Sequence, residues 1–177
     1  MTAPVSRDPI RLERWTVTAG SNVTSRAAVV LAAGGRDWKA SAEGTGAVDA
    51  LYRAVDTALA EILGGHPQLL AYDVHAIAEG PDAEGQVTVR IAPPASAGNE
   101  RAAGRFTGVM SSTNTIAASV EAYVEALNAM LGAAPWVGAA EAAASARGPN
   151  RGHEQPATSA ELDAEAEPID ATEWFNR

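Results

Sequence analysis

The stretch that decides the fold is Ala42-Glu43-Gly44-Thr45-Gly46-Ala47-Val48-Asp49-Ala50-Leu51-Tyr52. It ends an extended segment, turns at two glycines and begins an amphipathic helix. The glycines let the backbone approach another group closely and adopt a positive φ angle. The first amides of the helix point at the same place and carry the positive end of the helix dipole. Such a turn suits a bound carboxylate or phosphate, but it equally suits an ordinary tight connection between a strand and a helix.

The helix after this turn is predicted from apolar residues at three- and four-residue steps, which form one face. These residues are Leu51, Tyr52, Val55, Leu59, Ile62 and Leu63. Gly64 and Gly65 end the helix, and Pro67 prevents its continuation. The strands predicted upstream are residues 12–18, 26–33 and 37–43. A hairpin turn is predicted at Gly34 and Gly35, between the last two of these strands.

The same order of elements is predicted a second time. The expected strands are residues 69–79, 86–92 and 104–110, and the expected helix is 116–131, preceded by N-cap side chains at 111–114. The two glycine-containing helix starts lie 64 positions apart when Gly44 is aligned with Gly108. The predicted fold class is therefore α+β, with two βββα repeats, each an antiparallel three-stranded sheet covered by one helix.

Composition narrows the class of protein. The chain has 177 residues, 46% of them hydrophobic, so one domain with a hydrophobic core is expected. The formal net charge of -9 argues against nucleic acid and anionic membranes as partners. The absence of cysteine excludes thiol catalysis, disulfides and thiolate metal sites. No apolar run predicts a signal peptide or a membrane span, so a cytoplasmic location is expected.

Composition also divides the chain into a polar leader at residues 1–11, a domain at 12–131 and an acidic, Ala- and Pro-rich tail at 132–177. The tail holds eight of the 22 acidic residues and few large aliphatic side chains. Such a segment cannot bury enough apolar surface to offset its ordering entropy. It is therefore predicted to be disordered, apart from a transient helix at 141–146.

The sequence lacks the patterns expected of a catalytic or metal site. His66, His75 and His153 are far apart and belong to no HxH or HExxH arrangement, so no metal site is predicted. No GxSxG motif provides a nucleophile elbow. The pair Gly44 and Gly46 lacks the third glycine of a dinucleotide fingerprint and the Lys-Ser/Thr of a P-loop. The chain is therefore predicted not to be an enzyme and to need no cofactor.

Three separated motifs occur in one order along the chain. They are residues 44–52; Tyr72-Asp73-Val74-His75-Ala76 followed by residues 80–89; and residues 108–119, continued by the helix at 122–128. Together they resemble the C-terminal regulatory domain of 2-isopropylmalate synthases and of the related citramalate synthases. The resemblance covers about residues 12–131.

The resemblance implies an architecture and a ligand. It implies a homodimer of repeated βββα units that binds leucine, or isoleucine in the citramalate synthase relatives, near the dimer interface and inhibits a separate TIM-barrel catalytic domain. Free helix-start amides suit the α-carboxylate of such an effector, and small or aliphatic side chains suit its branched tail. Carried over by position, the ligand-binding residues are Gly44, Gly46, Ala47, Val48, Ala50, Leu69, Tyr72, Ala76, Ala83, Asn114 and Ile116.

Three places depart from the family's pattern. Ala47 stands where proline is common, residues 109–110 are Val-Met where Arg-Gly is common, and Asn114 replaces an aspartate. Losing the aspartate removes a carboxylate that would meet an ammonium group or brace the turn. Placing Met110 where a glycine is common narrows the site.

Two functional hypotheses follow. In the first, the chain is a free-standing regulatory domain, without room for a catalytic barrel of about 250 residues, that binds a branched-chain amino acid and modulates a separate synthase. In the second, it is a degenerate dimeric interaction module that has lost the ligand and binds a protein partner through its acidic tail. Val109, Met110 and Asn114 favour the second hypothesis, and the first helix start, which is intact apart from Ala47, favours the first.

Overall fold

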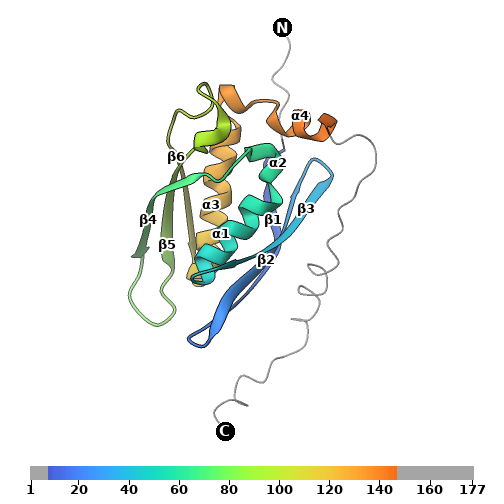
Figure 1. Ribbon diagram of the computed structural model, residues 1–177. Coiled ribbons are helices and arrows are strands. Elements are labelled where there is room, and N and C mark those ends of the chain that lie inside the picture. The colour runs from blue at the N-terminus through green and yellow to red at the C-terminus, as the bar shows by residue number, and fades with distance from the viewer. Residues whose placement is uncertain (1–7, 147–177) are drawn as a thin grey trace.

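The computed structural model describes residues 8–146, which form two antiparallel sheets with helices between them (Figure 1). The first sheet has the strand order β1-β2-β3 and the second β4-β5-β6. The strands are β1 (Arg11–Gly20), β2 (Val23–Ala33), β3 (Arg36–Gly44), β4 (Gln68–Ala76), β5 (Gly85–Ala92) and β6 (Phe106–Ser112). The helices are α1 (Ala47–Ala58), α2 (Ala60–Leu63), α3 (Thr115–Leu131) and α4 (Ala139–Ala146), with 3-10 turns η1 (Ala95–Ala97) and η2 (Ala134–Trp136). The predicted fold class of two βββα units is confirmed.

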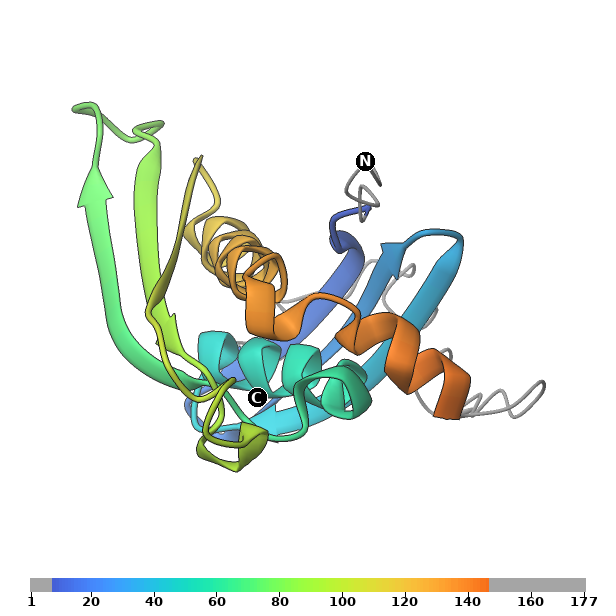
Figure 2. The same ribbon diagram turned by 90° about the horizontal axis from the view of Figure 1, so that it is seen from above.

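Each sheet is covered by the helix that follows it. Helix α1 packs on β2 and β3, α3 packs on β5 and β6, and the two helices contact each other. Seen from above, the two sheets flank this pair of helices (Figure 2). On the central strand β5, the alternate residues Val87, Val89 and Ile91 are fully buried. Every second residue of the strands and one face of each helix therefore pack together in a single core. Within residues 8–146, no helix is long and apolar enough to cross a membrane.

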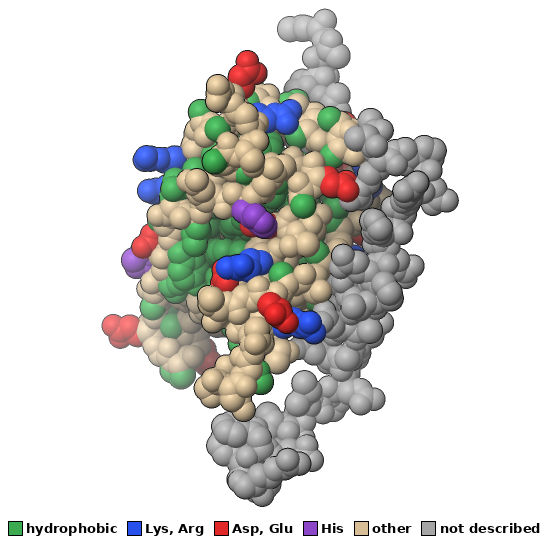
Figure 3. All heavy atoms as spheres, viewed as in Figure 1, with side chains coloured by type: hydrophobic (Ala, Val, Ile, Leu, Met, Phe, Trp, Pro, Cys, Tyr) green, Lys and Arg blue, Asp and Glu red, His purple; other side chains and the backbone are tan. Residues whose placement is uncertain are grey.

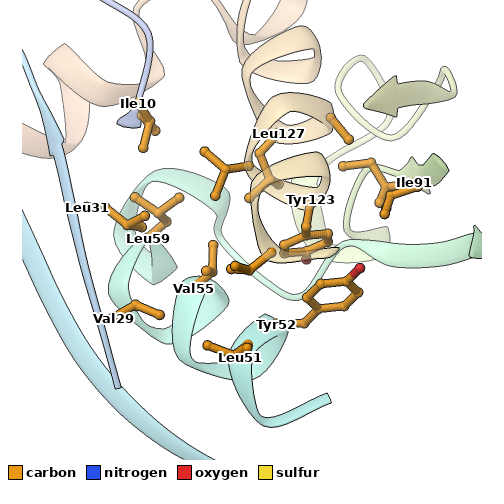
Figure 4. Packing of buried hydrophobic residues seen from close by; sticks show 14 of the residues in the cluster. Ile10, Val29, Leu31, Leu51, Tyr52, Val55, Leu59, Ile91, Tyr123 and Leu127 are labelled. Carbon is orange, nitrogen blue, oxygen red and sulfur yellow. The ribbon is translucent and has the colours of Figure 1, made fainter. Parts of the chain in front are cut away.

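Two tyrosines join the two βββα units. The rings of Tyr52 on α1 and Tyr123 on α3 stack with centroids 4.2 Å apart and an interplanar angle of 16° (Figure 4). The Tyr52 hydroxyl donates to the carbonyl oxygen of Ser119 (3.2 Å), and the Tyr123 hydroxyl donates to Oδ1 of Asp56 (2.6 Å). Each of these bonds joins residues 67 positions apart, so both connect the first βββα unit to the second.

The register of the repeat differs from the predicted one. The N-cap residues are Gly46 for α1 and Asn114 for α3, so the helix starts are further apart than the alignment of Gly44 with Gly108 requires. The single helix predicted over 48–63 is also divided, because Leu59 leaves helical geometry with φ -100° and ψ 11°. The glycine motif therefore predicted the repeat correctly but not its offset.

The two aligned glycines have different structural roles. A Cβ atom on Gly44 would meet the backbone of Ala50, in the first turn of α1. A Cβ atom on Gly108 would instead meet the carbonyl oxygen of Ala122 and, at 2.6 Å, the nitrogen of Ala126. These atoms lie in the middle of α3, so the missing side chain of Gly108 lets β6 lie directly against that helix.

Residues on both sides of the predicted domain belong to the fold. Ile10, expected in the leader, is buried, and the Asn128 side chain bonds both its N–H (2.9 Å) and its carbonyl oxygen (2.8 Å). Trp136, expected in the disordered tail, is 1% exposed, and its Nε1 donates to the carbonyl oxygen of Arg101 (3.2 Å). The Arg101 guanidinium also lies 5.4 Å from the centroid of the Trp136 ring.

The structure therefore differs from the expectation of a tail that begins at residue 132. Residues 132–146 fold onto the domain, and α4 occupies the place where a transient helix was expected. The physical reason is that one large aromatic side chain buries enough surface to dock a segment that is otherwise poor in large apolar residues. The remainder of the predicted tail, residues 147–177, lies outside the described residues.

The close contact between β6 and α3 predicts that Gly108→Ala is strongly destabilising. The added methyl group meets helix backbone, which cannot move aside as a flexible side chain does, so we expect a loss of about 3 kcal/mol in the free energy of unfolding. The control is Gly46→Ala, because a Cβ atom there meets nothing within 4 Å and should cost under about 1 kcal/mol. Urea denaturation measures both, and equal losses would contradict the role assigned to Gly108.

The burial of Trp136 predicts that Trp136→Ala destabilises the whole domain. Removing a buried Trp side chain typically costs about 3–5 kcal/mol. Val137→Ala is the matched control, because the neighbouring Val137 is 67% exposed and should change stability by less than about 0.5 kcal/mol. The readout is the urea midpoint followed by far-ultraviolet circular dichroism. A Trp136→Ala variant as stable as Val137→Ala would show that residues 132–146 contribute nothing to the fold.

Candidate functional site

Strand β4 carries apolar side chains that the helices leave open. Tyr72 pairs with Val89 and Val74 pairs with Val87, so both lie on the helix-facing side of the second sheet. Helix α3 covers β5 and β6 but not β4, and Leu69, Tyr72 and Val74 therefore remain 49%, 38% and 43% exposed. We call these three residues the β4 stripe. A contiguous apolar surface left open in this way is typical of a binding site or an interface.

The start of α1 lies at the same end of the molecule as the start of α3 (Figure 1). The bond from Tyr52 to Ser119 holds the early turns of the two helices side by side. The hydroxyl of Tyr72 lies 2.8 Å from Oγ of Ser119, which connects β4 to the same place. Because the Ser119 hydroxyl donates to the carbonyl oxygen of Thr115 (2.6 Å), Tyr72 is the donor in its bond with Ser119.

The two helix starts differ in how their amides are satisfied. In α3, Oδ1 of Asn114 accepts from the backbone N–H of Ile116 (3.1 Å) and of Ala117 (3.2 Å), as a capping side chain does. In α1, the N-cap Gly46 provides no side-chain bond. Asn114 therefore braces this turn as the expected aspartate would, but it carries no charge. The first amides of α1 are left available to another acceptor.

Asp49 sets the charge at the start of α1. Its Oδ2 accepts from the backbone N–H of Thr45 (2.9 Å) and from Nε of Arg53 (2.9 Å). The bond from Thr45, helped by Arg53, lowers the pKa of Asp49 below its ordinary value despite some desolvation. The carboxylate is therefore charged and already paired, so it opposes a second anion at this turn only weakly.

The predicted ligand-binding residues fall into three groups in the structure, and one of these residues, Leu69, pairs with Ile91 at the end of the second sheet away from the start of α3. The groups are Gly44, Gly46, Ala47, Val48 and Ala50 at the start of α1, Leu69, Tyr72 and Ala76 on β4, and Asn114 and Ile116 at the start of α3. Ala50 is fully buried in the core, so it supports the turn from below instead of facing an open surface. Ala83 lies in the β4–β5 turn, where its N–H donates to the carbonyl oxygen of Gly80 (3.2 Å). The ligand roles of all these residues remain predictions.

A cavity of about 330 Å³ opens beside the β4 stripe, and sequence reasoning found only one of its residues, Leu69. Its lining residues are Asp49, Tyr52, Arg53, Asp56, His66, Pro67, Leu69 and Tyr123. Figure 3 shows a hollowed hydrophobic area over β4 and α1, with basic, acidic and histidine side chains around its edge. The sequence feature that could have indicated this cavity is Asp56, because it places an acidic residue on the apolar face of α1, four positions after Tyr52.

Asp56 is the buried charge of this cavity. Only 6% of the residue is exposed, and its carboxylate bonds the hydroxyl of Tyr123 and, at 3.2 Å, Nδ1 of His66. Burial raises the pKa of Asp56 above its ordinary value, and the bonds from Tyr123 and His66 oppose this shift only in part. Burial, reinforced by the neighbouring Asp56, also raises the pKa of Tyr123. Tyr123 is therefore the hydrogen-bond donor of this pair over the whole physiological range.

Fold and site together define a class: an α+β domain of two βββα units with an open apolar groove at its paired helix starts. Among the described residues, no three histidine, cysteine or acidic side chains are grouped to hold a metal ion. Residues 2–131 match the family described as the LeuA allosteric (dimerisation) domain, and the chain belongs to this family. The resemblance read from the three motifs is confirmed, and the domain is the regulatory one, not the catalytic one.

The relatives are 2-isopropylmalate synthases. That of Aromatoleum aromaticum is 40% identical over 105 residues, covering 59% of this chain and 18% of the relative. Those of Nitrosococcus oceani and Methylobacterium nodulans are 37% and 35% identical, covering 68% and 78% of this chain and 21% and 24% of the relatives. The chain therefore spans about a fifth of the length of the curated relatives that it matches.

The raised pKa of Asp56 predicts a pH-dependent effect of Asp56→Asn. The folded protein favours the protonated carboxyl more than the unfolded chain does. The contribution of the Asp56 carboxyl to the free energy of unfolding is therefore fully present at low pH, and it is lost as the pH rises through the pKa of the folded state. Asparagine stays neutral, so the free energy of unfolding of the variant should rise relative to wild type between pH 4 and pH 7.

The control for this experiment is Asp49→Asn, in which the sign is reversed. The pKa of Asp49 is lowered in the folded protein, so its contribution is present above the ordinary value and is lost as the pH falls. This variant should therefore lose stability relative to wild type as the pH rises. Urea denaturation at both pH values gives the two differences, and the same sign for both would contradict the electrostatic description of the site.

Proposed function

We propose that this domain binds a branched-chain amino acid, with leucine as the first candidate, between the β4 stripe and the start of α1. The observation that carries the proposal is that one cavity is lined both by Asp49, in the first turn of α1, and by Leu69 of the β4 stripe. The amides at the start of α1 suit an α-carboxylate, because they lack a capping side chain and carry the positive end of the dipole. The β4 stripe suits a branched apolar side chain.

The Tyr72 hydroxyl supports this arrangement. Its bond to Ser119 fixes the direction of the Tyr72 ring, so one ring face forms a wall of the groove instead of moving freely in water. Ser119 in turn holds Tyr52 through its carbonyl oxygen. A groove whose walls are fixed before the ligand arrives loses less side-chain entropy on binding.

The homodimer is the assembly that suits this site. The family is described as a dimerisation domain, which supports a homodimer. We propose that the β4 stripe is part of the contact between two copies, because β4 is an edge strand with exposed apolar side chains. A second copy seated there would cover the groove and exclude water from a bound effector.

Regulation is the proposed consequence of binding. The family is described as allosteric, and the relatives are named 2-isopropylmalate synthase. We propose that binding of the amino acid to this domain changes the activity of the catalytic domain of such a synthase. We also propose that this domain performs no catalysis itself. A ligand acts in this way only if it binds two states of the assembly with different affinity.

Isothermal titration of the full chain with leucine, isoleucine and valine tests the proposal. We expect binding of at least one of them and a matching rise in the thermal midpoint. Tyr72→Ala should weaken binding about tenfold, because it removes a wall of the groove. Val109→Ala is the matched control, since Val109 is similarly exposed at 41% but lies on the other face of the same sheet, and it should leave affinity unchanged.

Absence of heat and of a thermal shift with all three amino acids at millimolar concentration would contradict ligand binding. Sedimentation of the same samples then shows whether the chain is a dimer, as the remaining hypothesis requires. A dimer that Leu69→Asp and Val74→Asp dissociate would favour the second hypothesis, a dimeric interaction module that has lost the ligand. A monomer at every concentration would contradict both hypotheses.

A further inference from the structure

Ser25 is a buried serine whose hydroxyl has no hydrogen-bonding partner among residues 8–146. The residue is only 6% exposed. The other fully buried serine, Ser119, differs in this respect, because its hydroxyl donates to the carbonyl oxygen of Thr115. Leaving a buried hydroxyl without a partner is costly, so most proteins satisfy such a group. The hydroxyl of Ser25 is therefore available to a group from outside the chain.

The side chain of Ser25 faces the start of α1. Ser25 on β2 pairs with Gly44 on β3, and paired residues of neighbouring strands carry their side chains on the same face of the sheet. A Cβ atom on Gly44 would meet the backbone nitrogen of Ala50. This face of the pair is therefore turned toward the first turn of α1. Strand alternation agrees, because Ala27 and Val29 on the same strand belong to the core beneath this helix.

The pairing of β2 with its other neighbour is irregular at this residue. Between the pair Thr18–Arg26 and the pair Gly20–Val23, β1 advances by two residues and β2 by three. Ser25 therefore lies in a β-bulge, although its pairing with β3 is regular. Such bulges often direct a side chain toward a functional site.

The second βββα unit has the same two residue types in exchanged positions. Gly44 and Ser112 are equivalent, since each stands two positions before the N-cap of its helix. Across the strands, Gly44 pairs with Ser25. Ser112 pairs with Gly85 instead. The Ser112 hydroxyl has a partner, because it accepts from the N–H of Asn114 (3.0 Å). The fold thus satisfies the serine of the second unit and leaves that of the first unit open.

The position of Gly85 shows what the Ser25 side chain lies beside. A Cβ atom on Gly85 would lie 3.3 Å from Oγ1 of Thr115, which is the first residue of α3. The first residue of α1 is Ala47, and the N-cap before it provides no side-chain bond to the first amides. By this equivalence, the Ser25 hydroxyl lies beside the uncapped amides of α1. A hydroxyl and free backbone amides together form a group of hydrogen-bond donors.

We propose that Ser25 is a further binding residue of the effector site, and that its hydroxyl donates a hydrogen bond to the α-carboxylate at the start of α1. This inference rests on the proposed function, because it assigns one more donor to the ligand proposed above. A carboxylate has two oxygens and about four acceptor positions, so it accepts from the hydroxyl and from the helix amides at the same time. Hydrogen bonds to a charged acceptor are stronger than those between neutral groups. The bond formed on binding therefore offsets the cost of an unpaired hydroxyl in the unliganded chain.

The test is titration of the full chain and of Ser25→Ala with leucine, isoleucine and valine. We expect Ser25→Ala to weaken binding of the amino acid that wild type binds by about ten- to hundredfold, the range for loss of a hydrogen bond to a charged group. Thermal unfolding without ligand is the second readout. Because the hydroxyl has no partner in the unliganded chain, its removal should leave the thermal midpoint unchanged or raise it.

Ser41→Ala is the matched control. Ser41 lies on β3, three residues from Gly44, so strand alternation places its side chain on the face of the sheet that points away from α1. The same loss of a hydroxyl there should change neither the affinity nor the thermal midpoint.

The outcomes separate this inference from the proposed function. If wild type and Ser25→Ala bind the amino acid equally well, this inference is wrong and the proposed function stands. A lower thermal midpoint with unchanged affinity would also overturn it, because the hydroxyl would then have a structural partner such as a buried water. Absence of binding to wild type contradicts the proposed function itself, and with it the role of Ser25.

Discussion

The stacked pair of Tyr52 and Tyr123 is the contact on which the rest of the structure depends. Each βββα unit is too small to bury the apolar faces of its own sheet and helix alone. The two rings place α1 against α3 in a fixed register, and their hydroxyls bond Ser119 and Asp56 on the opposite helix. Because each hydroxyl reaches across to the other unit, a shift of one helix breaks both bonds. The relative position of the two helix starts, and so of the proposed groove, follows from this contact.

The same contact explains why an acidic residue is kept inside the core. Asp56 satisfies the Tyr123 hydroxyl, which otherwise would be buried without a partner. The cost is a carboxylate in a desolvated position, open to a cavity on its other side. A polar group that orients a core contact and also faces a cavity links packing to ligand chemistry. Stability at this place therefore depends on the protonation of Asp56.

Sequence patterns predicted the order of the elements and the faces of the helices, because hydrophobic periodicity is local. The offset of the repeat was not predictable from Gly44 and Gly108, since the two glycines make room for different backbone segments, and only the fold shows which. Trp136 was missed because average composition hides a single residue that docks its segment. Asp56 was missed because an acidic residue in a helix is usually solvated, and its partner Tyr123 lies far along the chain. The bond between Tyr72 and Ser119 was not predictable either, because it joins residues 47 positions apart.

The unequal capping of α1 and α3 has a consequence for stoichiometry. The fold is duplicated, so the backbone alone offers two equivalent anion positions per chain. Asn114 fills one of them with its own side chain, and Gly46 leaves the other open. In the proposed site, a carboxylate that depends on free helix amides has one position per chain, so we expect two such ligands and not four in a pair of chains.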